Sequence, residues 1–453
     1  MDMLNKLKST VSTTVSQLSG NLSGVLPGNP VTREYEVLKL IGSAGPDLLW
    51  KIYSGYKKST KQEASIFVLE KKLLARYAKK DSDQLVEVLR KGVAQLTRIR
   101  HPMVLTVQHA VEESRESLAF ATEPVFASLA NVLGCHENVN PVPQQLKDYK
   151  LFEVEIKYGL QQLIEGLIFL HNDVKLLHSN ICPESIIVNQ QGNCPGYQQS
   201  DLIINNPSFI PFSGAFKIFG FDFCTASQDA KLWPVREPDP ELPSVAQSNL
   251  DYLAPELGRN PRRHGNGANT ITCGPSADMY SLGCVIVSIY QKGKSPWQMD
   301  GDVESFYRHA SSHSQPLQRM EGVPPELVDH VRSLLHPTPE QRPDAHQLVK
   351  IGWFDDVGVK TLNYLDSLFQ WDNLQKSQVS RLLVIYFLVS TLNPMTLFCF
   401  CFQVFQRFAS NSSTAAGTCL PPQGDAMLGK RNGESIHGPF HFALRAPHHP
   451  RGQ

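Results

Sequence analysis

The segment from Leu177 to Val188, LHSNICPESIIV, constrains the fold of this chain more than any other part of its sequence. Two of its polar side chains, Asn180 and Ser185, carry no charge. An amide takes up no proton near neutral pH, and a neutral hydroxyl is a weaker ligand for a hard dication than a carboxylate or a well-placed carbonyl. Neither of these two positions therefore offers a general base or a strong ligand for a metal ion.

This segment resembles the protein-kinase catalytic loop, H-R-D-L-x-P-E-N-I-L-V. Three further kinase landmarks follow in order: A-P-E at 254–256, Asp278 before a long apolar run, and Arg342 in Q-R-P. The resemblance implies an α+β, bilobal protein kinase-like fold with a small β-rich N-lobe and a large helical C-lobe. It also implies a buried ion pair between Glu256 and Arg342, and breaking such a pair costs about 3–5 kcal/mol.

The resemblance extends to positions that pack. It implies that Leu96, His178 and Phe221 form a hydrophobic stack above Asp278 that joins the two lobes, so His178 is interpreted as structural. The residues assigned structural roles are Leu96, His178, Phe221, Glu256, Asp278 and Arg342.

The positions that carry kinase chemistry hold other residues. Phe67 stands where a lysine grips the phosphates, Gly92 where a helix-C glutamate pairs with that lysine, and Gly220 where an aspartate binds magnesium. The degenerate catalytic positions are Phe67, Gly92, Asn180, Ser185 and Gly220. Because positioning and charge neutralisation supply nearly all of phosphoryl-transfer catalysis, we expect no catalytic residue and no metal site.

The glycine-rich phosphate loop is also altered, because residues 42–47 retain only the first glycine of G-x-G-x-x-G in register. Pro46 stiffens the turn and removes an amide donor, and Asp47 places negative charge where phosphates would bind. The remaining nucleotide cleft would be lined by Gly42, Ala44, Asp47, Ser65 and Glu123. We expect no required cofactor. A weakly active atypical serine/threonine kinase that binds ATP is the alternative.

Two charged residues near these positions are candidates to replace the lost groups. Lys51 lies on the second expected strand, and Asp222 lies two residues beyond the missing metal ligand. We interpret Lys51 as a solvated strand lysine and Asp222 as an ordinary loop carboxylate. Lys71 and Lys72 are interpreted as a solvated edge, so none of the four is expected to act on phosphate.

Segments outside these motifs resemble the SCY-like pseudokinases, with the coated-vesicle-associated kinase branch as the best match. They are residues 59–63, 100–102, 105–109, 122–134 and 220–224, with further matches at 354–358 and 368–378. The resemblance runs from about Met3 to Gln378. It implies an adaptor in clathrin-associated traffic between Golgi, endosomes and plasma membrane, with clathrin and its adaptor complexes as partners. Members of this family continue into a helical-repeat domain, and the divergence after Gln378 weakens the partner inference.

The predicted organisation has five parts. Residues 1–30 form an N-terminal arm, residues 31–354 a pseudokinase domain (N-lobe 31–123, C-lobe 124–354), and residues 355–380 a helical extension that starts a truncated repeat region. Residues 381–406 contain an apolar run, 382–405, long enough to span a bilayer, which makes a membrane-anchored variant a second alternative. An alternative exon or unspliced reading frame is the rival explanation, and residues 407–453 are expected to be disordered.

The charge and cysteine content of the chain argue against some classes of function. The chain has 43 basic and 43 acidic residues and no dominant basic tract, which argues against a nucleic-acid partner. Nine cysteines without C-x-x-C spacing favour a reducing compartment and no zinc site. The first residues lack the pattern of a signal peptide. We therefore expect a cytoplasmic protein, peripheral on coated vesicles, Golgi or endosomes.

Overall fold

The computed structural model describes residue 26 and residues 28–189, 215–227, 233–234, 236–258, 273–312 and 320–367. The predictions for residues 1–25, for the hydrophobic segment 381–406 and for the tail 407–453 lie outside these ranges. The predicted helical extension is described as far as residue 367, where α12 (Val357–Ser367) ends. Within the described ranges, no helix is both long and apolar enough to cross a membrane.

The small lobe is built on a five-stranded antiparallel sheet in the order β1-β2-β3-β5-β4. Its strands are β1 (Tyr35–Ala44), β2 (Trp50–Lys57), β3 (Glu63–Glu70), β4 (Val107–Glu113) and β5 (Ser117–Thr122). Side chains alternate between two faces, and both faces of β3 are buried. Ile52 and Phe67 pack toward α3 (Lys79–Arg98), whereas Tyr53, Ile66 and Val68 form a second apolar cluster on the other face.

The helix expected over residues 83–98 begins earlier, at Lys79, and ends as predicted at Arg98. Its buried side chains recur at helical spacing, at Leu85, Leu89, Gly92, Val93 and Leu96. This stripe faces the small-lobe sheet and the 3₁₀ turn η5 (Phe221–Phe223) of the large lobe. The position of α3 therefore determines how the two lobes meet.

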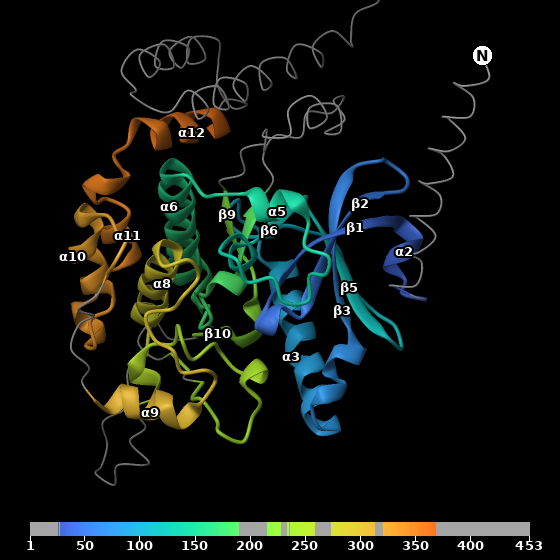
Figure 1. Ribbon diagram of the computed structural model, residues 1–453, viewed down its shortest axis with the longest axis horizontal. Coiled ribbons are helices and arrows are strands. Elements are labelled where there is room, and N and C mark those ends of the chain that lie inside the picture. Colours follow the sequence, from blue (N-terminus) through green and yellow to red (C-terminus); the bar gives the residue numbers. More distant parts are fainter. Residues whose placement is uncertain are drawn as a thin grey trace, which may run out of the picture. The chain divides into compact units, whose positions relative to one another are not determined.

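The large lobe begins with the three-stranded sheet β6-β8-β9 and is otherwise mainly helical (Figure 1). The central helix α8 (Pro275–Tyr290) is buried along most of its length, since 13 of its 16 residues are inaccessible. The remaining elements are α2 (Val31–Glu34), η1 (Pro46–Leu48), η2 (Lys71–Arg76), β6 (Val125–Ser128), α4 (Leu129–Val132), α5 (Gln144–Asp148), α6 (Glu153–Phe169), η3 (Leu170–Val174), β7 (Leu176–Leu177), η4 (Pro183–Ser185), β8 (Ile186–Asn189), β9 (Phe216–Ile218), β10 (Thr225–Ala226), η6 (Ser244–Ala246), η7 (Pro255–Gly258), α9 (Val303–Ser311), α10 (Pro325–Leu334), η8 (Pro339–Gln341), α11 (Ala345–Leu348) and η9 (Gly352–Phe354).

The α+β, bilobal fold predicted from the sequence is confirmed. Figure 1 shows the β-rich lobe and the helical lobe side by side, with α3 at their junction. The catalytic-loop segment folds as β7, η4 and β8, so Asn180 and Ser185 lie under the small lobe, as the sequence comparison requires. The candidate site is therefore the region between β1–β3 of the small lobe and η4 and η5 of the large lobe.

Candidate functional site

An aromatic cluster occupies the position where a kinase lysine would grip phosphate. Phe67 of β3 stacks on Phe120 of β5 with ring centroids 4.9 Å apart, and its ring lies 5.3 Å from that of Phe219. Trp50 of β2 meets Phe120 edge-on at 5.0 Å. Phe67, Phe120 and Trp50 are fully buried. Stacked rings of this kind contribute about 0.5–1.5 kcal/mol per pair beyond their buried area, so the cluster stabilises the lobe and binds no anion.

The altered glycine-rich loop lies against the catalytic loop instead of leaving a space for phosphates. The backbone amide of Gly45 donates to the carbonyl oxygen of Glu184 at 2.9 Å. The side-chain amide of Asn138 donates to the carbonyl oxygens of Asp47 and Leu48, at 3.3 and 3.1 Å. Phosphate loops bind anions through free backbone amides. Here the Gly45 amide at the tip of the loop already has a protein acceptor.

The strand leading into this loop is bound in the same way. The backbone amide of Ser43 donates to Asn131 Oδ1 at 2.7 Å, and the Ser43 hydroxyl donates to the carbonyl oxygen of Glu137 at 2.7 Å. A Cβ at Gly42 would lie 2.7 Å from the same Asn131 oxygen, which explains the glycine there. Ser43 and Ala44 are fully buried. The end of β1 is therefore part of the protein interior.

Asp47 does not place its charge at a phosphate position, contrary to the sequence-based expectation. The residue adopts a left-handed conformation, φ 50°, and its Oδ2 lies 3.3 Å from both the Arg76 guanidinium and the Tyr77 hydroxyl. The left-handed turn rotates the carboxylate toward η2 at the lobe surface. A motif alignment fixes the position of a residue along the chain but not this backbone rotation, so the sequence did not reveal it.

Ser65 and Glu123, the other residues expected to line the cleft, are also engaged. The Ser65 hydroxyl accepts from the backbone amide of Val125 at 3.0 Å, in the segment that connects the lobes. Glu123 forms an ion pair with Lys217, with Nζ–O distances of 2.7 and 2.9 Å, and accepts from the Thr106 amide at 2.8 Å. A base edge that needed the Val125 amide as a donor would have to displace a buried serine.

The two polar residues of the catalytic loop serve the loop itself. Ser185 Oγ donates to the carbonyl oxygen of Asn180 at 2.7 Å and accepts from the Cys182 amide at 3.0 Å. Asn180 Oδ1 accepts from the backbone amide of Asn249 at 2.9 Å. Both residues are buried. Their polar atoms therefore hold the loop against the activation segment, in the places where kinases keep the base and a metal ligand.

Asp222 is buried, so its interpretation as an ordinary loop carboxylate was wrong. It is 8% exposed, and its Oδ2 has no hydrogen-bond partner in the part of the chain that the structure describes. Burial raises the pKa of this carboxyl to about 7. A Cβ at Gly92 would lie 2.1 Å from its Oδ1, and a Cβ at Gly220 would lie 3.7 Å from its Oδ2 and 2.9 Å from the Cβ of Ser185.

Two of the five degenerate positions thus border one carboxyl group. Gly92 on α3 and Gly220 below it carry no side chain, which leaves room for Asp222 between the helix and the catalytic loop. A glutamate at position 92 would collide with it. The substitutions remove kinase chemistry and also make room for a different packing arrangement, which only the three-dimensional structure reveals.

Lys51 is not a solvated lysine but a member of an ion pair on the far face of the sheet. It pairs in register with Val68, and its Nζ lies 2.7 Å from Glu70 Oε1, with both side chains largely buried. Phe67 faces the opposite side, so Lys51 cannot substitute for the missing lysine. Lys72, in contrast, is 77% exposed, and Lys71 pairs with Glu113 at 2.6 Å.

The Glu256–Arg342 pair that the sequence led us to expect is present and buried. Two guanidinium nitrogens of Arg342 each lie 2.7 Å from a different Glu256 oxygen. The same guanidinium donates to the carbonyl oxygens of Ser276 at 2.9 Å and His336 at 2.7 Å. These contacts satisfy the paired charges inside the C-lobe, which is the condition for a buried ion pair to persist.

Asp278 organises the catalytic loop from below. Its oxygens accept from the backbone amides of His178 and Ser179, both at 2.8 Å, and lie 2.9 Å from His171 Nε2. Burial alone would raise the pKa of Asp278, but these hydrogen bonds and the neighbouring histidines outweigh it and hold the pKa below its usual value. The His178 and Phe221 rings meet edge-on at 4.9 Å, and Leu96 is buried in the core above them.

The geometry leaves little means for phosphoryl transfer. The cleft residues are stacked, hydrogen-bonded or turned away, and the described residues contain no group of three or more His, Cys, Asp or Glu side chains that could hold a metal ion. The arrangement can bind the two lobes together.

Comparison with known proteins identifies the family. The protein kinase domain family matches residues 41–354. Human SCY1-like protein 2 is 47% identical over 386 residues, which cover 83% of this chain and 38% of that protein. A Schizosaccharomyces pombe protein kinase domain-containing protein, ppk32, is 29% identical over 335 residues (70% of this chain, 40% of that protein). The protein kinase-like protein SCY1 of Saccharomyces cerevisiae is 25% identical over 355 residues (72% and 40%). The chain spans about two fifths of the length of these relatives.

Proposed function

Because this chain belongs to the protein kinase domain family, in which it resembles the SCY1-like proteins, we propose that it is a pseudokinase scaffold that binds partners and transfers no phosphate. The observation that carries this proposal is the contact of the glycine-rich loop with the catalytic loop, through Gly45 and Glu184, above the buried Phe67 cluster. The space in which a kinase holds ATP is filled by the protein itself.

Nucleotide entry would require several simultaneous changes. The Gly45–Glu184 and Ser43–Asn131 hydrogen bonds would have to break, at about 1 kcal/mol each net, and the Phe67 ring would have to leave a fully buried position. No lysine or metal-binding aspartate would then compensate the phosphate charge. The balance favours the closed cleft over the bound nucleotide.

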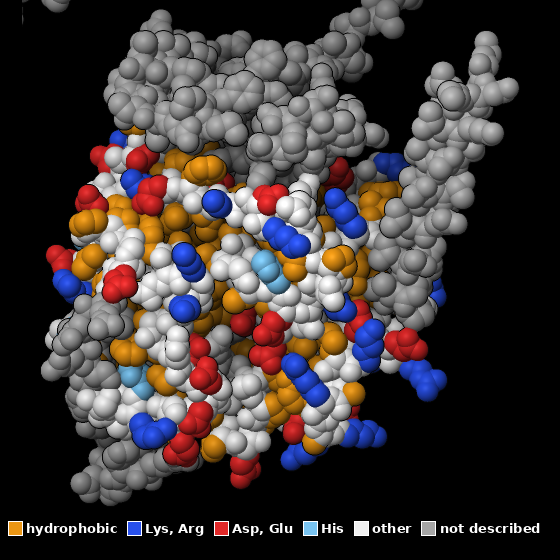
Figure 2. All heavy atoms as spheres, viewed as in Figure 1, with side chains coloured by type: hydrophobic (Ala, Val, Ile, Leu, Met, Phe, Trp, Pro, Cys, Tyr) orange, Lys and Arg blue, Asp and Glu red, His pale blue; other side chains and the backbone are white. Residues whose placement is uncertain are grey.

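We further propose that the scaffold acts in clathrin-associated traffic between Golgi, endosomes and plasma membrane, on the cytoplasmic side of coated vesicles. Support comes from the resemblance of residues 59–63, 105–109 and 122–134 to the SCY-like pseudokinases. Figure 2 shows basic and acidic side chains interspersed over the face in view, which suits protein partners better than nucleic acid. Clathrin and its adaptor complexes are the proposed partners, and residues 382–405 are a proposed membrane contact.

Nucleotide binding tests the central claim. The full-length protein is titrated with ATP, with and without magnesium, by calorimetry and by thermal shift, beside an active kinase as positive control. Saturation at 100 times Kd would stabilise the fold by about 2.7 kcal/mol, which is readily measured. We expect no heat and no shift at millimolar ATP. Magnesium-dependent binding would contradict the interpretation of Ser185 and Gly220 and would require a phosphotransfer assay.

Partner binding is tested separately. Immobilised full-length protein is incubated with purified clathrin triskelia and with purified adaptor complex, and retention is compared with that on an inactive-kinase domain of unrelated sequence. Selective retention of either coat component supports the traffic proposal. Equal retention on both matrices would reject it while leaving the closed cleft untouched.

A further inference from the structure

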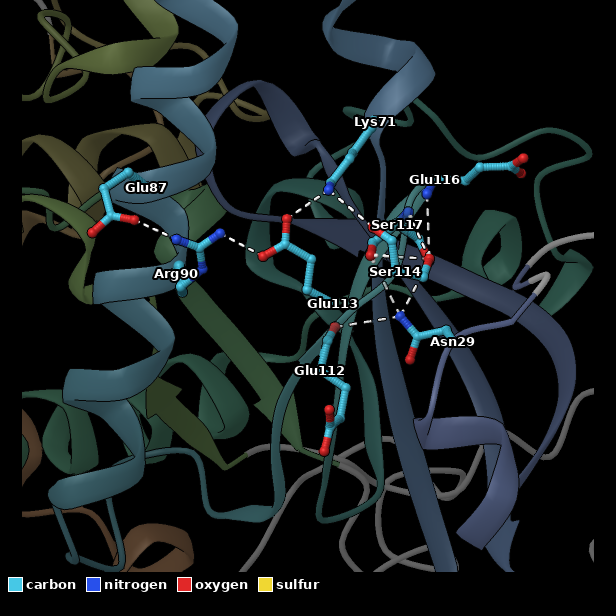
Figure 3. Close-up of polar contacts among 9 residues, drawn as sticks. All are labelled: Asn29, Lys71, Glu87, Arg90, Glu112, Glu113, Ser114, Glu116 and Ser117. Carbon is cyan, nitrogen blue, oxygen red and sulfur yellow. Dashed lines mark hydrogen bonds and ion pairs between the residues drawn. The ribbon is translucent and has the colours of Figure 1, made fainter.

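The kinase ion pair that normally holds helix C is absent, yet α3 is held on the small lobe by a set of ionic contacts on its outer side (Figure 3). Arg90 in the middle of α3 contacts Glu87 on its own helix and Glu113 at the end of β4. Glu113 also lies 2.6 Å from Lys71 Nζ, at the start of η2, the turn that leads into α3. We call Lys71, Glu87, Arg90 and Glu113 the external clamp.

The external clamp fastens η2 and α3 to the β4–β5 turn, each at one place. Lys71 donates from its side chain to the carbonyl oxygen of Ser114 at 2.9 Å and from its backbone amide to that of Glu116 at 2.8 Å. Arg90, 19 residues further along the chain and on α3 itself, makes the second attachment. Both attachments end on residues 113–116, so the position of this turn determines the position of the helix.

The same turn is held from the other side by the N-terminal strap, residues 28–35. Asn29 Nδ2 lies within 3.2 to 3.4 Å of Ser117 Oγ and of the carbonyl oxygens of Ser117 and Glu112. Its Oδ1 accepts from the Val31 amide at 3.1 Å. Asn29 is 1% exposed, although it belongs to a segment that only crosses the sheet surface. Figure 3 shows Asn29 and Arg90 reaching the turn from opposite sides.

We propose that the N-terminal strap positions α3 through the β4–β5 turn and the external clamp, in place of the internal lysine–glutamate pair that this chain lacks. The strap has its own anchor, since Val31 and Tyr35 pack with Ile66 and Val68 on the outer face of the sheet. The route is contiguous: strap, turn, clamp and helix each contact the next.

This chain of contacts ends at the interface between the lobes. On its inner side α3 presents Gly92 directly to Asp222 of η5, with no room for a Cβ between them. A small displacement of α3 therefore changes the burial of Asp222 and the closure of the cleft. Asn29 of the strap, 63 residues earlier in the chain than Gly92, thereby acts on the packing between the lobes.

Individual ion pairs at this exposure contribute little, because Arg90 and Glu113 are 40% and 39% exposed. The effect of the clamp comes from joining several weak contacts to one buried amide. The sharpest single perturbation is therefore Asn29→Ala, which removes the buried donor without touching α3.

Hydrogen exchange of the full-length protein tests this inference. Four variants are compared with the wild type: Asn29→Ala and Arg90→Met, with Arg33→Gln and Arg98→Met as exposed controls on the strap and on α3. We expect Asn29→Ala to accelerate exchange in α3 by about tenfold, the change that corresponds to one net hydrogen bond. Arg90→Met should accelerate it by a smaller factor, roughly two- to fivefold, because its ion pairs are partly exposed. The controls leave exchange in α3 unchanged. Circular dichroism verifies that each variant is folded.

The double variant Asn29→Ala/Arg90→Met decides whether the strap acts through the clamp. If it does, the double variant accelerates α3 exchange by less than the product of the two single effects, because Arg90→Met has already removed the contact between the turn and α3. Additive effects would overturn the route. Acceleration confined to the strap and the β4–β5 turn in Asn29→Ala would overturn the whole inference. Neither readout depends on nucleotide or partner binding, so failure here is distinct from failure of the scaffold proposal.

Discussion

The nucleotide cleft and the interior of the C-lobe differ in their charged residues: the cleft lacks charges that kinases have there, whereas the C-lobe keeps them. In the cleft, charged kinase positions hold Phe67, Gly92 and Gly220, and the space is filled by rings and backbone. In the C-lobe, the charges of Glu256 and Arg342 remain, buried and fully paired. A charge that binds a ligand can be lost without harm to the fold, whereas a charge that pairs within the core cannot be removed alone. The comparison therefore distinguishes charged residues that bind a ligand from charged residues that stabilise the fold.

Removing one charge in the C-lobe is the severest test of this comparison. Arg342→Met leaves Glu256 buried without a cation, and we expect a loss of about 3–5 kcal/mol in the free energy of unfolding, measured by urea denaturation. The double variant Arg342→Met/Glu256→Met should recover much of this loss, because no charge is then left unpaired. A single variant as stable as the wild type would show that the pair is not structural.

Restoring a charge in the cleft should be nearly as harmful. Phe67→Lys places an ammonium among three aromatic rings without a carboxylate on α3, and we expect a loss of about 3 kcal/mol and no phosphotransfer. Phe67→Leu, which keeps the position apolar, should lose clearly less. Urea denaturation and a radiometric kinase assay check the two expectations. Activity in the lysine variant would mean that the cleft is open.

The small residue at position 92 offers a test of packing without charge. Alanine is a better helix former than glycine by about 1 kcal/mol, yet a Cβ at Gly92 would lie 2.1 Å from Asp222 Oδ1. We therefore expect Gly92→Ala to destabilise the protein by about 1–3 kcal/mol. Gly352→Ala is the matched control, since a Cβ there meets nothing within 4 Å. Stabilisation by Gly92→Ala would refute the close contact between α3 and η5.

The smallest expected effect concerns the protonation of Asp222. Its pKa is about 7 in the folded protein and near 3.8 when exposed, so the folded state binds the proton more tightly. The resulting stabilisation is complete below pH 4 and is lost as the pH rises through 7, on the order of 1 kcal/mol between pH 6 and 8. Asp222→Asn should abolish this part of the pH dependence. If the Tm of Asp222→Asn changes as steeply between pH 6 and pH 8 as that of the wild type, the pH dependence does not come from Asp222.

The fold could be predicted because its determinants are ordered motifs. Ala254-Pro255-Glu256, Asp278 and Arg342 occur in one sequence order, and each has a single role in a bilobal domain. The Glu256–Arg342 contact was implied by the resemblance of these motifs to those of protein kinases. The helix expected from residue 83 starts at Lys79 because Lys79 to Asp81 lack the apolar periodicity on which the prediction depended.

For the candidate site, the sequence predicted only which kinase residues are missing. The sequence shows that position 92 is glycine, but not that Asp222 turns toward it, because side-chain direction depends on the φ 74° turn at Gly220. The face on which Lys51 lies depended on strand register, and its partner Glu70 comes from the next strand. Sequence order identified what was missing, and packing determined what replaced it.

The contact between Gly45 and Glu184 has a consequence for assembly. Active kinases open and close about the segment between their lobes, whereas here a backbone hydrogen bond joins the two moving parts directly. Two partners bound to different lobes would consequently have less freedom to move relative to one another than on a kinase without this bond. The domain would then act as a spacer whose geometry influences the effective concentration of one partner for the other.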